Sequence, residues 1–244
     1  LFSTDGSVIA SHGIEYPLYS PTPEIAEQDP EEIFRAVINT IKETVQSSSV
    51  QPNDILCVSF SSAMHSIIAV DEKGKPLTRC ITWADNRSAS WAEKIKNDMN
   101  GHEIYLRTGT PIHPMSPLSK LVWLQNEQAE LFAKSYKFIS IKEYVFYKLY
   151  KGYVIDYSIA SATGMFNLKS LKWDEEALHV AGITDDKLSK LVPTTHSLTG
   201  LDEELAKEMN VLVSTPFVVG ASDGVLSNLG VNAIDPGVVA VTIG

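Results

Sequence analysis

An acidic residue near the end of the sequence, Asp223, stands where a strand is expected to give way to a helix. Residues 217–219 form a short apolar run with β-branched side chains between Pro216 and Gly220, a pattern that predicts a buried strand. Ser222 can cap a following helix, whose apolar residues recur with a period of 3.6. Open α/β sheets bind ligands at this edge, where a carboxylate can accept a proton from a hydroxyl or help to hold a metal ion. The alternative is a carboxylate that only complements the helix dipole.

Met64 and His65 form a second candidate pair. They follow the apolar run 55–60, which predicts another buried strand. At a strand end an imidazole can face a ligand, whereas the alternative is a hairpin histidine whose ring is satisfied within the protein. The sequence leaves both interpretations open.

A third cluster lies in residues 82–87, after a further expected strand. It places an aromatic ring, an acid and a guanidinium, on Trp83, Asp85 and Arg87, within six positions. Such a cluster can fix several hydroxyl groups of a ligand, or Asp85 can simply cap a helix while Arg87 lies on the surface. Lys120, in the first turns of a later helix, could meet an anion, although lysines in such positions are commonly solvated.

Several other chemistries find no support in the sequence. The histidines at positions 12, 102, 113, 179 and 196 form no set with the spacing of metal ligands. There is no Walker-type glycine loop and no G-x-S-x-G motif of a serine hydrolase. Cys57 and Cys80 lie in apolar runs and are expected to be reduced core residues of a cytoplasmic protein.

Composition narrows the class of partner. The 244 residues include 30 acidic and 20 basic side chains, so the net charge is 20 − 30 = −10. This charge argues against nucleic acid or an anionic membrane as the main partner, but not against a small anion in a local pocket. No segment approaches the 18 consecutive apolar residues that a membrane span requires, so we expect no membrane partner.

The expected elements alternate between strands and helices and predict an α/β fold with a mixed sheet. Asp29 and Pro30 open a helix with a cap and acids in its first turn. Residues 67–70 and 77–83 flank a turn-rich segment and predict a hairpin. Further expectations are strands over 7–19 and 237–244, an irregular segment over 101–117, and short helical stretches over 174–180, 184–191 and 201–209.

Taken together, these stretches resemble one family, the FGGY carbohydrate kinases. Residues 115–127 fit the first signature of that family at eight constrained positions: Met115, Pro117, Lys120, Leu121, Trp123, Leu124, Asn126 and Glu127. The segments 62–65, 83–88, 156–166 and 220–224 match in order and approximate spacing. The resemblance spans essentially the whole sequence.

The resemblance implies a ribonuclease-H-like fold, shared by actin, hexokinase and Hsp70, with a mixed sheet, flanking helices and helical insertions. It also implies ATP-dependent phosphorylation of a sugar or sugar acid, with ATP and Mg²⁺ as cofactors. Asp223 is then the catalytic base, close to the metal. The residues that line or adjoin the sugar site are Met64, His65, Trp83, Asp85 and Arg87, and those that begin a phosphate loop for ATP are Thr242 and Gly244.

The resemblance also indicates which substrate to expect within the family. Residues 62–65 followed by 83–88 are most similar to gluconate kinases, so the expected reaction converts gluconate to 6-phosphogluconate. Xylulose kinases share the Met-His pair and are the alternative. His65, Arg87 or Lys120 could neutralise a sugar-acid carboxylate. A sugar-sensing or structural actin-like domain is the non-enzyme alternative, and a homodimer is a further hypothesis.

Both ends of the sequence look cut. The opening strand and the glycine–threonine phosphate hairpin of the family would precede Leu1, and the nucleotide-binding lobe would follow Gly244. We therefore expect residues 1–244 to be a substrate-binding domain that lacks these parts. Such a domain is expected to phosphorylate nothing by itself.

Overall fold

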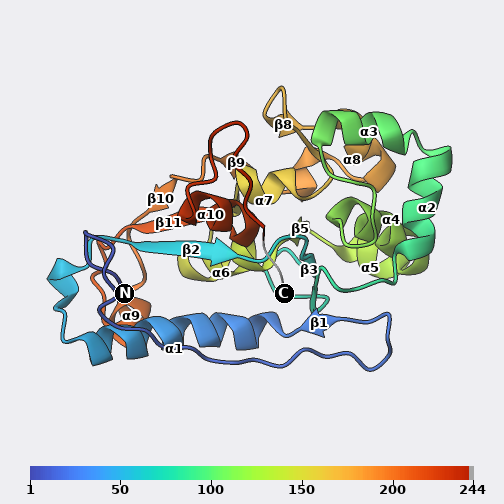
Figure 1. Cartoon of the computed structure of the whole chain (residues 1–244). Coiled ribbons are helices and arrows are strands. Elements are labelled where there is room, and N and C mark those ends of the chain that lie inside the picture. The colour runs from blue at the N-terminus through green and yellow to red at the C-terminus, as the bar shows by residue number, and fades with distance from the viewer. Residues whose placement is uncertain (242–244) are drawn as a thin grey trace.

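A pair of parallel strands sets the direction in which the candidate site faces. In the computed structural model, which describes residues 1–241, β2 (Val58–Ser62) and β11 (Phe217–Ser222) lie side by side in parallel (Figure 1). The short strand β10 (Ser197–Leu198) joins β11 in the antiparallel direction. A second parallel pair, β6 (Val154–Asp156) and β9 (Lys190–Val192), contacts this sheet through β6 and β11. The chain therefore leaves β2 and β11 at the same sheet edge.

Three antiparallel pairs complete the strands of residues 1–241. They are β1 (Glu27–Gln28) with β4 (Cys80–Ile81), β3 (Ile68–Val70) with β5 (Lys137–Ile139), and β7 (Phe166–Asn167) with β8 (Lys172–Trp173). Parallel and antiparallel pairs interleaved with helices make a mixed α/β architecture. The predicted fold class is confirmed at this level.

A long helix, α1 (Pro30–Ser48), runs along one side of the molecule (Figure 1). It begins where Asp29 accepts hydrogen bonds from two amides of its first turn, with Pro30 at the first helical position, as the sequence predicts. The helices α6 (Ile141–Tyr150) and α9 (Glu203–Met209) pack against it. The buried residues of α1 and α6 share one apolar core with strands β3 and β11.

A second apolar core lies among helices farther from the sheet. Its helices are α2 (Ala89–Asp98), α3 (Gly101–Thr108), α4 (Pro117–Glu127), α5 (Ala129–Lys134) and α8 (Glu175–Ala181), gathered to the right in Figure 1. Ile95, Ile104 and Leu121 are fully buried in it. This helical group holds α4, the helix of the signature residues, against β3 and β4.

A bulge shapes the end of β11. The pairing register with β2 shifts between Val218 and Ala221, and Gly220 between them has a φ of +65°. A Cβ atom on Gly220 would lie 1.9 Å from the carbonyl oxygen of Phe60 on β2. Only glycine fits this position, because it tolerates both the left-handed backbone and the close approach of the neighbouring strand.

The predicted strand over residues 7–19 is wrong. Only isolated bridges, Phe2 with Val8 and Tyr19 with Glu27, occur in this region. Val8 and Leu18 are 65% and 54% exposed, so the apolar pattern has no buried surface against which to pack. Without such a surface, the apolar residues of the segment do not enforce a strand.

Three other local predictions are corrected by non-local contacts. The segment expected to be irregular begins with helix α3, whose residue Ile104 is buried against α2. The expected hairpin is reduced to single bridges, since β3 pairs with β5 and β4 with β1. The last part of the stretch 184–191 joins strand β9, and its first part is a 3₁₀ turn, Asp185–Lys187.

The two cysteines differ in their exposure to solvent. Cys80 is buried as expected, whereas Cys57 is exposed.

Residues 237–241 carry no strand, and the expected strand continues into residues 242–244, outside the described part of the chain. Across the described residues, none of the helices combines the length and apolar character that crossing a lipid bilayer demands.

Candidate active site

The register of β2 and β11 brings two predicted site segments together. Ser62 at the end of β2 is the pairing partner of Ser222 at the end of β11. Met64 follows the first strand and Asp223 the second, so both emerge at one edge of the sheet. Their closeness is visible at Gly224, where a Cβ atom would lie 3.2 Å from the Met64 methyl carbon.

Asp223 is the first residue of α10 (Asp223–Gly230) and is exposed. Its Oδ1 atom accepts a 2.8 Å hydrogen bond from the Gly224 amide, and no residue of 1–241 donates to its Oδ2 atom. Ser222 caps the helix by accepting from the Val225 amide. One carboxylate oxygen is thus held at the helix start while the other is free to meet a ligand.

His65, the residue after Met64, is held in an unusual conformation. Its backbone has a φ of +67°, and its Nδ1 atom lies 2.8 Å from the Ala162 carbonyl oxygen. Burial lowers the pKa of the imidazole, and the Lys120 charge lowers it further, whereas the Ala162 carbonyl and the Asp223 charge act in the opposite direction.

The short helix α7 (Tyr157–Ser161) connects the two halves of this arrangement. Ser158 accepts a 2.7 Å hydrogen bond from the Ser222 amide, and Ala162, just after the helix, holds the His65 ring. Asp156 caps α7 through the amides of its first turn and forms a buried ion pair of 2.6 Å with Lys142. The contacts of Ser158 with Ser222 and of Ala162 with His65 carried no recognisable signal in the sequence.

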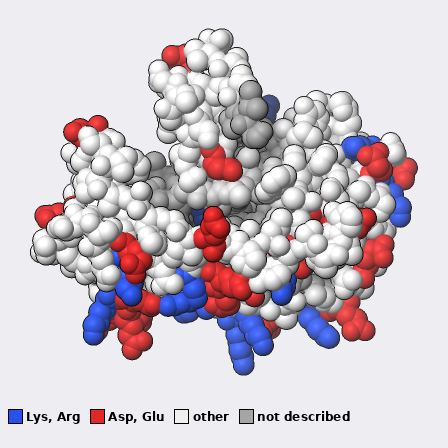
Figure 2. All heavy atoms as spheres, turned by 60° about the horizontal axis from the view of Figure 1, so that its bottom comes forward, with Lys and Arg blue, Asp and Glu red and all other residues white. Residues whose placement is uncertain are grey.

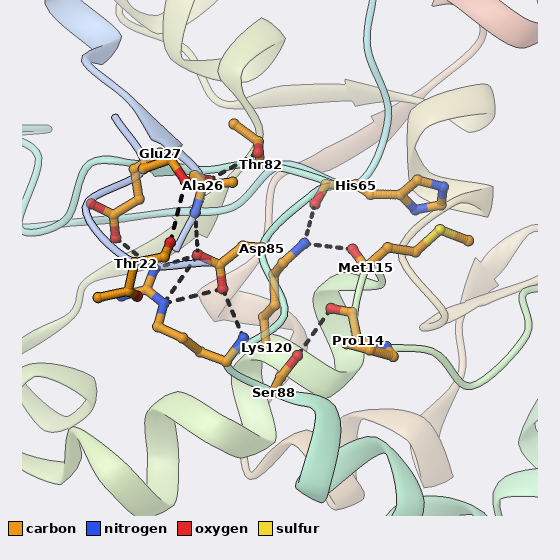
Figure 3. A network of polar contacts seen from close by, with 12 residues as sticks. Thr22, Ala26, Glu27, His65, Thr82, Asp85, Ser88, Pro114, Met115 and Lys120 are labelled. Atoms are coloured by element: carbon orange, nitrogen blue, oxygen red, sulfur yellow. Dashed lines mark hydrogen bonds and ion pairs between the residues drawn. The ribbon is translucent and has the colours of Figure 1, made fainter. Parts of the chain in front are cut away.

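Asp85 and Arg87 form a closed ionic network. Asp85 is fully buried and accepts from the Ala26 amide at 3.0 Å and from Arg87 Nε at 3.0 Å (Figure 3). Arg87 also donates to Glu27 at 2.5 Å and lies over the Trp123 ring, 4.6 Å from its centroid. The network joins β1 to the segment after β4, and Glu27 is a member that the sequence did not reveal.

Trp83 is the exposed member of this segment, with 60% of its surface accessible. The antiparallel bridge between Ile67 and Ile81 continues toward His65 on one strand and Trp83 on the other. His65 and Trp83 each lie two positions beyond the bridge, at the same end of it.

Lys120 is not the solvated lysine that the sequence left open as one alternative. It is fully buried, so it is not a solvated lysine, and its ammonium group donates to the carbonyls of His65 and Met115 (Figure 3). Burial lowers the pKa of Lys120 to about 7, while Asp85 and Cys80 favour its charged form.

The structure describes only some of the residues predicted to contact the metal ion and the nucleotide. Residues 1–241 contain no cluster of three or more His, Cys, Asp or Glu that could hold a metal ion. A single free carboxylate oxygen, as on Asp223, nevertheless suits Mg²⁺, which commonly takes one or two carboxylates together with water and phosphate oxygens. Thr242 and Gly244, the residues predicted to contact ATP, lie outside the described residues.

A carboxylate at a strand–helix junction, at the same sheet edge as a histidine that follows the neighbouring parallel strand, is an arrangement suited to acting on a hydroxyl-bearing ligand. Comparison with known protein families agrees with a protein that acts on hydroxyl groups. Residues 1–230 match the N-terminal domain of the FGGY family of carbohydrate kinases. The chain belongs to the FGGY family of carbohydrate kinases.

Individual relatives refine the comparison. The chain is 61% identical over 245 residues to a gluconokinase of Bacillus subtilis, covering 100% of this chain and 47% of that protein. It is 62% identical to a gluconokinase of Bacillus licheniformis with the same coverage, and 28% identical to a xylulose kinase of Staphylococcus xylosus. The chain thus spans about half the length of the curated relatives that it matches.

Solved structures show the same fold. A ligand-bound xylulose kinase of Lactobacillus acidophilus superimposes with a TM-score of 0.92 at 39% identity, over 96% of this chain and 47% of the other. A gluconate kinase of the same species gives 0.87 at 40% identity, over 91% and 44%. The predicted ribonuclease-H-like sugar-kinase fold and the resemblance to the FGGY family are confirmed.

Proposed function

We propose that this chain is the substrate-binding part of a gluconokinase, which transfers the γ-phosphoryl group of ATP to a gluconate hydroxyl. The observation that carries the proposal is the 61% identity to a gluconokinase over the whole chain. The free oxygen of Asp223, beside Met64 and His65 at the sheet edge, supports it from the geometry.

Asp223 is proposed as the general base. As the substrate oxygen attacks the γ-phosphorus, its proton passes to the Asp223 Oδ2 atom, and ADP leaves with the electron pair of the broken bond. The Gly224 amide holds Oδ1, so the carboxylate presents one oxygen without searching among rotamers. The sequence neighbours of Asp223 therefore serve mainly to aim it.

Mg²⁺ and ATP belong to the same proposal. Bound Mg²⁺ neutralises charge on the phosphates of the nucleotide, and Asp223 is the residue of the described chain that would face it. Thr242 and Gly244 are proposed to contact the nucleotide. By this proposal, the site within residues 1–241 provides the acceptor side of the reaction.

Met64, His65 and Trp83 are proposed to contact the sugar acid. Asp85 is fully buried with its carboxylate bonded inside the protein, so its contribution is proposed to be indirect, by holding the segment that carries Trp83. Arg87 supports the same segment through its ion pairs. Recognition of gluconate is then proposed to depend on its hydroxyl groups rather than on an ion pair with Arg87.

Xylulose is the second candidate substrate. The TM-score of 0.92 to a xylulose kinase favours it, although its identity to this chain is 39%. A cytoplasmic location and a homodimer are proposed alongside the activity. Figure 2 shows acidic and basic side chains intermixed on one face, with no continuous basic surface there, which together with the net charge of −10 supports a small-molecule substrate rather than nucleic acid.

A coupled assay of ADP release tests the proposal. The full-length protein is supplied with ATP, Mg²⁺ and, in separate reactions, gluconate, xylulose, ribulose or glycerol. We expect the highest kcat/KM with gluconate, and a tenfold preference needs only about 1.4 kcal/mol of differential transition-state binding. A higher value with xylulose would replace the substrate, and ADP release with none of the four would refute the kinase proposal.

A further inference from the structure

The buried ammonium group of Lys120 is an unusual feature of the described chain. The side chain is 0% exposed, and none of the ion pairs within residues 1–241 includes it. Its Nζ atom donates instead to the carbonyl oxygens of His65 at 2.9 Å and Met115 at 2.5 Å. Burying an ammonium group is costly unless its hydrogen bonds are well placed, so these two carbonyls define where Lys120 must sit.

One of these carbonyls belongs to the residue with the left-handed backbone at the candidate site. His65 has a φ of +67°, a left-handed conformation that is unfavourable for a residue with a Cβ atom. Figure 3 shows the Lys120 side chain reaching toward the His65 carbonyl from α4. The hydrogen bond fixes the direction of the peptide group that follows His65 and so favours this conformation over an extended one.

The imidazole of His65 is fixed from the opposite side. A backbone carbonyl can only accept, so the contact of Nδ1 with the Ala162 carbonyl requires the proton to be on Nδ1. In the neutral ring the lone pair then lies on Nε2, for which residues 1–241 supply no donor. Burial lowers the pKa of His65, which favours this neutral form of the ring.

We propose that Lys120 is a positioning residue: through the carbonyl of His65 it holds the left-handed backbone that presents the neutral Nε2 atom as an acceptor for a substrate hydroxyl. The inference rests on the proposed function for the identity of the ligand as a polyol. By this proposal Lys120 takes part in substrate recognition only indirectly, through His65, and does not itself contact an anion. A hydroxyl matches the Nε2 lone pair, whereas a carbonyl or carboxylate oxygen at that position would repel it.

The opposing interpretation is that Lys120 only ties two loops together. A matched variant separates the two, because Lys137 makes the same kind of contact elsewhere. Its ammonium group donates to the carbonyls of Asp186 and Leu188, at 2.6 and 2.9 Å, away from the site. Lys120→Met and Lys137→Met each remove a lysine that bridges two carbonyls and retain an unbranched side chain of similar length.

The first arm measures His65 directly in the full-length protein, without any sugar, by ¹⁵N NMR of labelled histidine side chains. We expect the Nδ1–H tautomer in the wild type, a change in the His65 ring shifts in Lys120→Met, and unchanged shifts in Lys137→Met. Unchanged His65 shifts in Lys120→Met would overturn the proposal. This arm keeps its meaning even if gluconate proves not to be the substrate.

The second arm is a double-mutant cycle on the KM for gluconate. Losing one well-placed hydrogen bond to substrate is worth about tenfold, so Lys120→Met should raise KM by roughly that factor with a smaller change in kcat. In a His65→Ala background the same change should raise KM less than about twofold, because the group that it positions is gone. Equal effects in both backgrounds would overturn the proposal.

If Lys120→Met does not fold, Lys120→Gln takes its place in both arms. The glutamine amide keeps two N–H donors on a shorter stem and carries no charge, so a KM between those of wild type and His65→Ala is expected. A folded Lys120→Gln protein with wild-type His65 shifts and an effect on KM that persists in the His65→Ala background would refute positioning through His65. A wild-type protein without gluconate activity refutes the proposed function alone.

Discussion

The backbone amide of Ser222 donates a 2.7 Å hydrogen bond to the hydroxyl of Ser158, 64 positions earlier in the chain. Ser222 caps the helix that begins with Asp223, so this bond attaches the start of α10 to α7. The other end of α7 is followed by Ala162, whose carbonyl holds the His65 ring. The five-residue helix α7 therefore sets the position of Asp223, the proposed base, relative to His65, which is proposed to contact the sugar.

Removing the Ser158 hydroxyl should loosen this link. In Ser158→Ala the buried Ser222 amide loses its acceptor, which should lower the free energy of unfolding by about 1–2 kcal/mol. Because even a small displacement of the Asp223 carboxylate from the substrate hydroxyl slows the reaction strongly, kcat should fall by about tenfold or more. Urea unfolding and the ADP-release assay measure the two effects.

Ser161→Ala is the control for this prediction. The Ser161 hydroxyl donates only to the Ser158 carbonyl within the same helix, so its loss leaves the contact with Ser222 in place. We expect kcat within about twofold of the wild type, since the lost hydroxyl makes its one hydrogen bond inside α7. Equal losses of kcat in the two variants would show that α7 does not aim Asp223 through Ser158.

Asp223→Asn tests the base itself. The amide keeps the size of the side chain but cannot take the substrate proton, so kcat should fall by about 10²–10⁴ while the dissociation constant for gluconate changes little. Stopped assays of ADP release and isothermal titration with gluconate measure the two quantities in the full-length protein. A sugar-sensing domain would instead retain binding and show no turnover to lose in the wild type.

Gly220→Ala tests the bulge that shapes β11. The added methyl group would need a left-handed backbone and would overlap the Phe60 carbonyl, so we expect a loss of about 2–5 kcal/mol in the free energy of unfolding. Gly152→Ala is the control, because a Cβ atom at Gly152 meets nothing within 4 Å. A Gly220→Ala protein as stable as Gly152→Ala would mean that the strands can separate without cost.

Glu143 should make stability depend on pH. Burial raises the pKa of this carboxyl to about 7, with the hydrogen bonds to Ser140 acting against the rise and the Asp156 charge adding to it. Between the unfolded value of about 4.5 and this folded value, the native state binds more protons than the unfolded state. The contribution of Glu143 to stability is therefore present below about pH 4.5 and is lost as the pH rises through about 7.

Glu143→Gln removes this titration while keeping an oxygen that can accept from the Ser140 amide. The variant should be more stable than the wild type near pH 8, and this advantage should shrink or reverse near pH 5. Urea midpoints at the two pH values measure the difference, with the exposed Glu130→Gln as the control. The same difference between wild type and Glu143→Gln at both pH values would contradict the prediction.

Local patterns were sufficient wherever an element depends on its own sequence. Asp29 and Pro30 start α1 as predicted, and the apolar run before Ser222 followed by a 3.6-residue period correctly placed the junction at Asp223. The segment 7–19 has an equally apolar pattern but forms no strand, because no partner surface covers it. Strand pairing was therefore less predictable than helix starts, since it depends on residues distant in sequence.

The sequence by itself determined the family, the fold class and the position of Asp223, because these follow from residue types at short, regular spacing. Only the tertiary structure decided that Lys120 is buried against the His65 carbonyl and that Asp85 and Arg87 are bound to Ala26 and Glu27. The physical reason is that many of these partners are backbone groups. Every residue carries a carbonyl and an amide, so no side-chain pattern marks which of them a buried charge will meet.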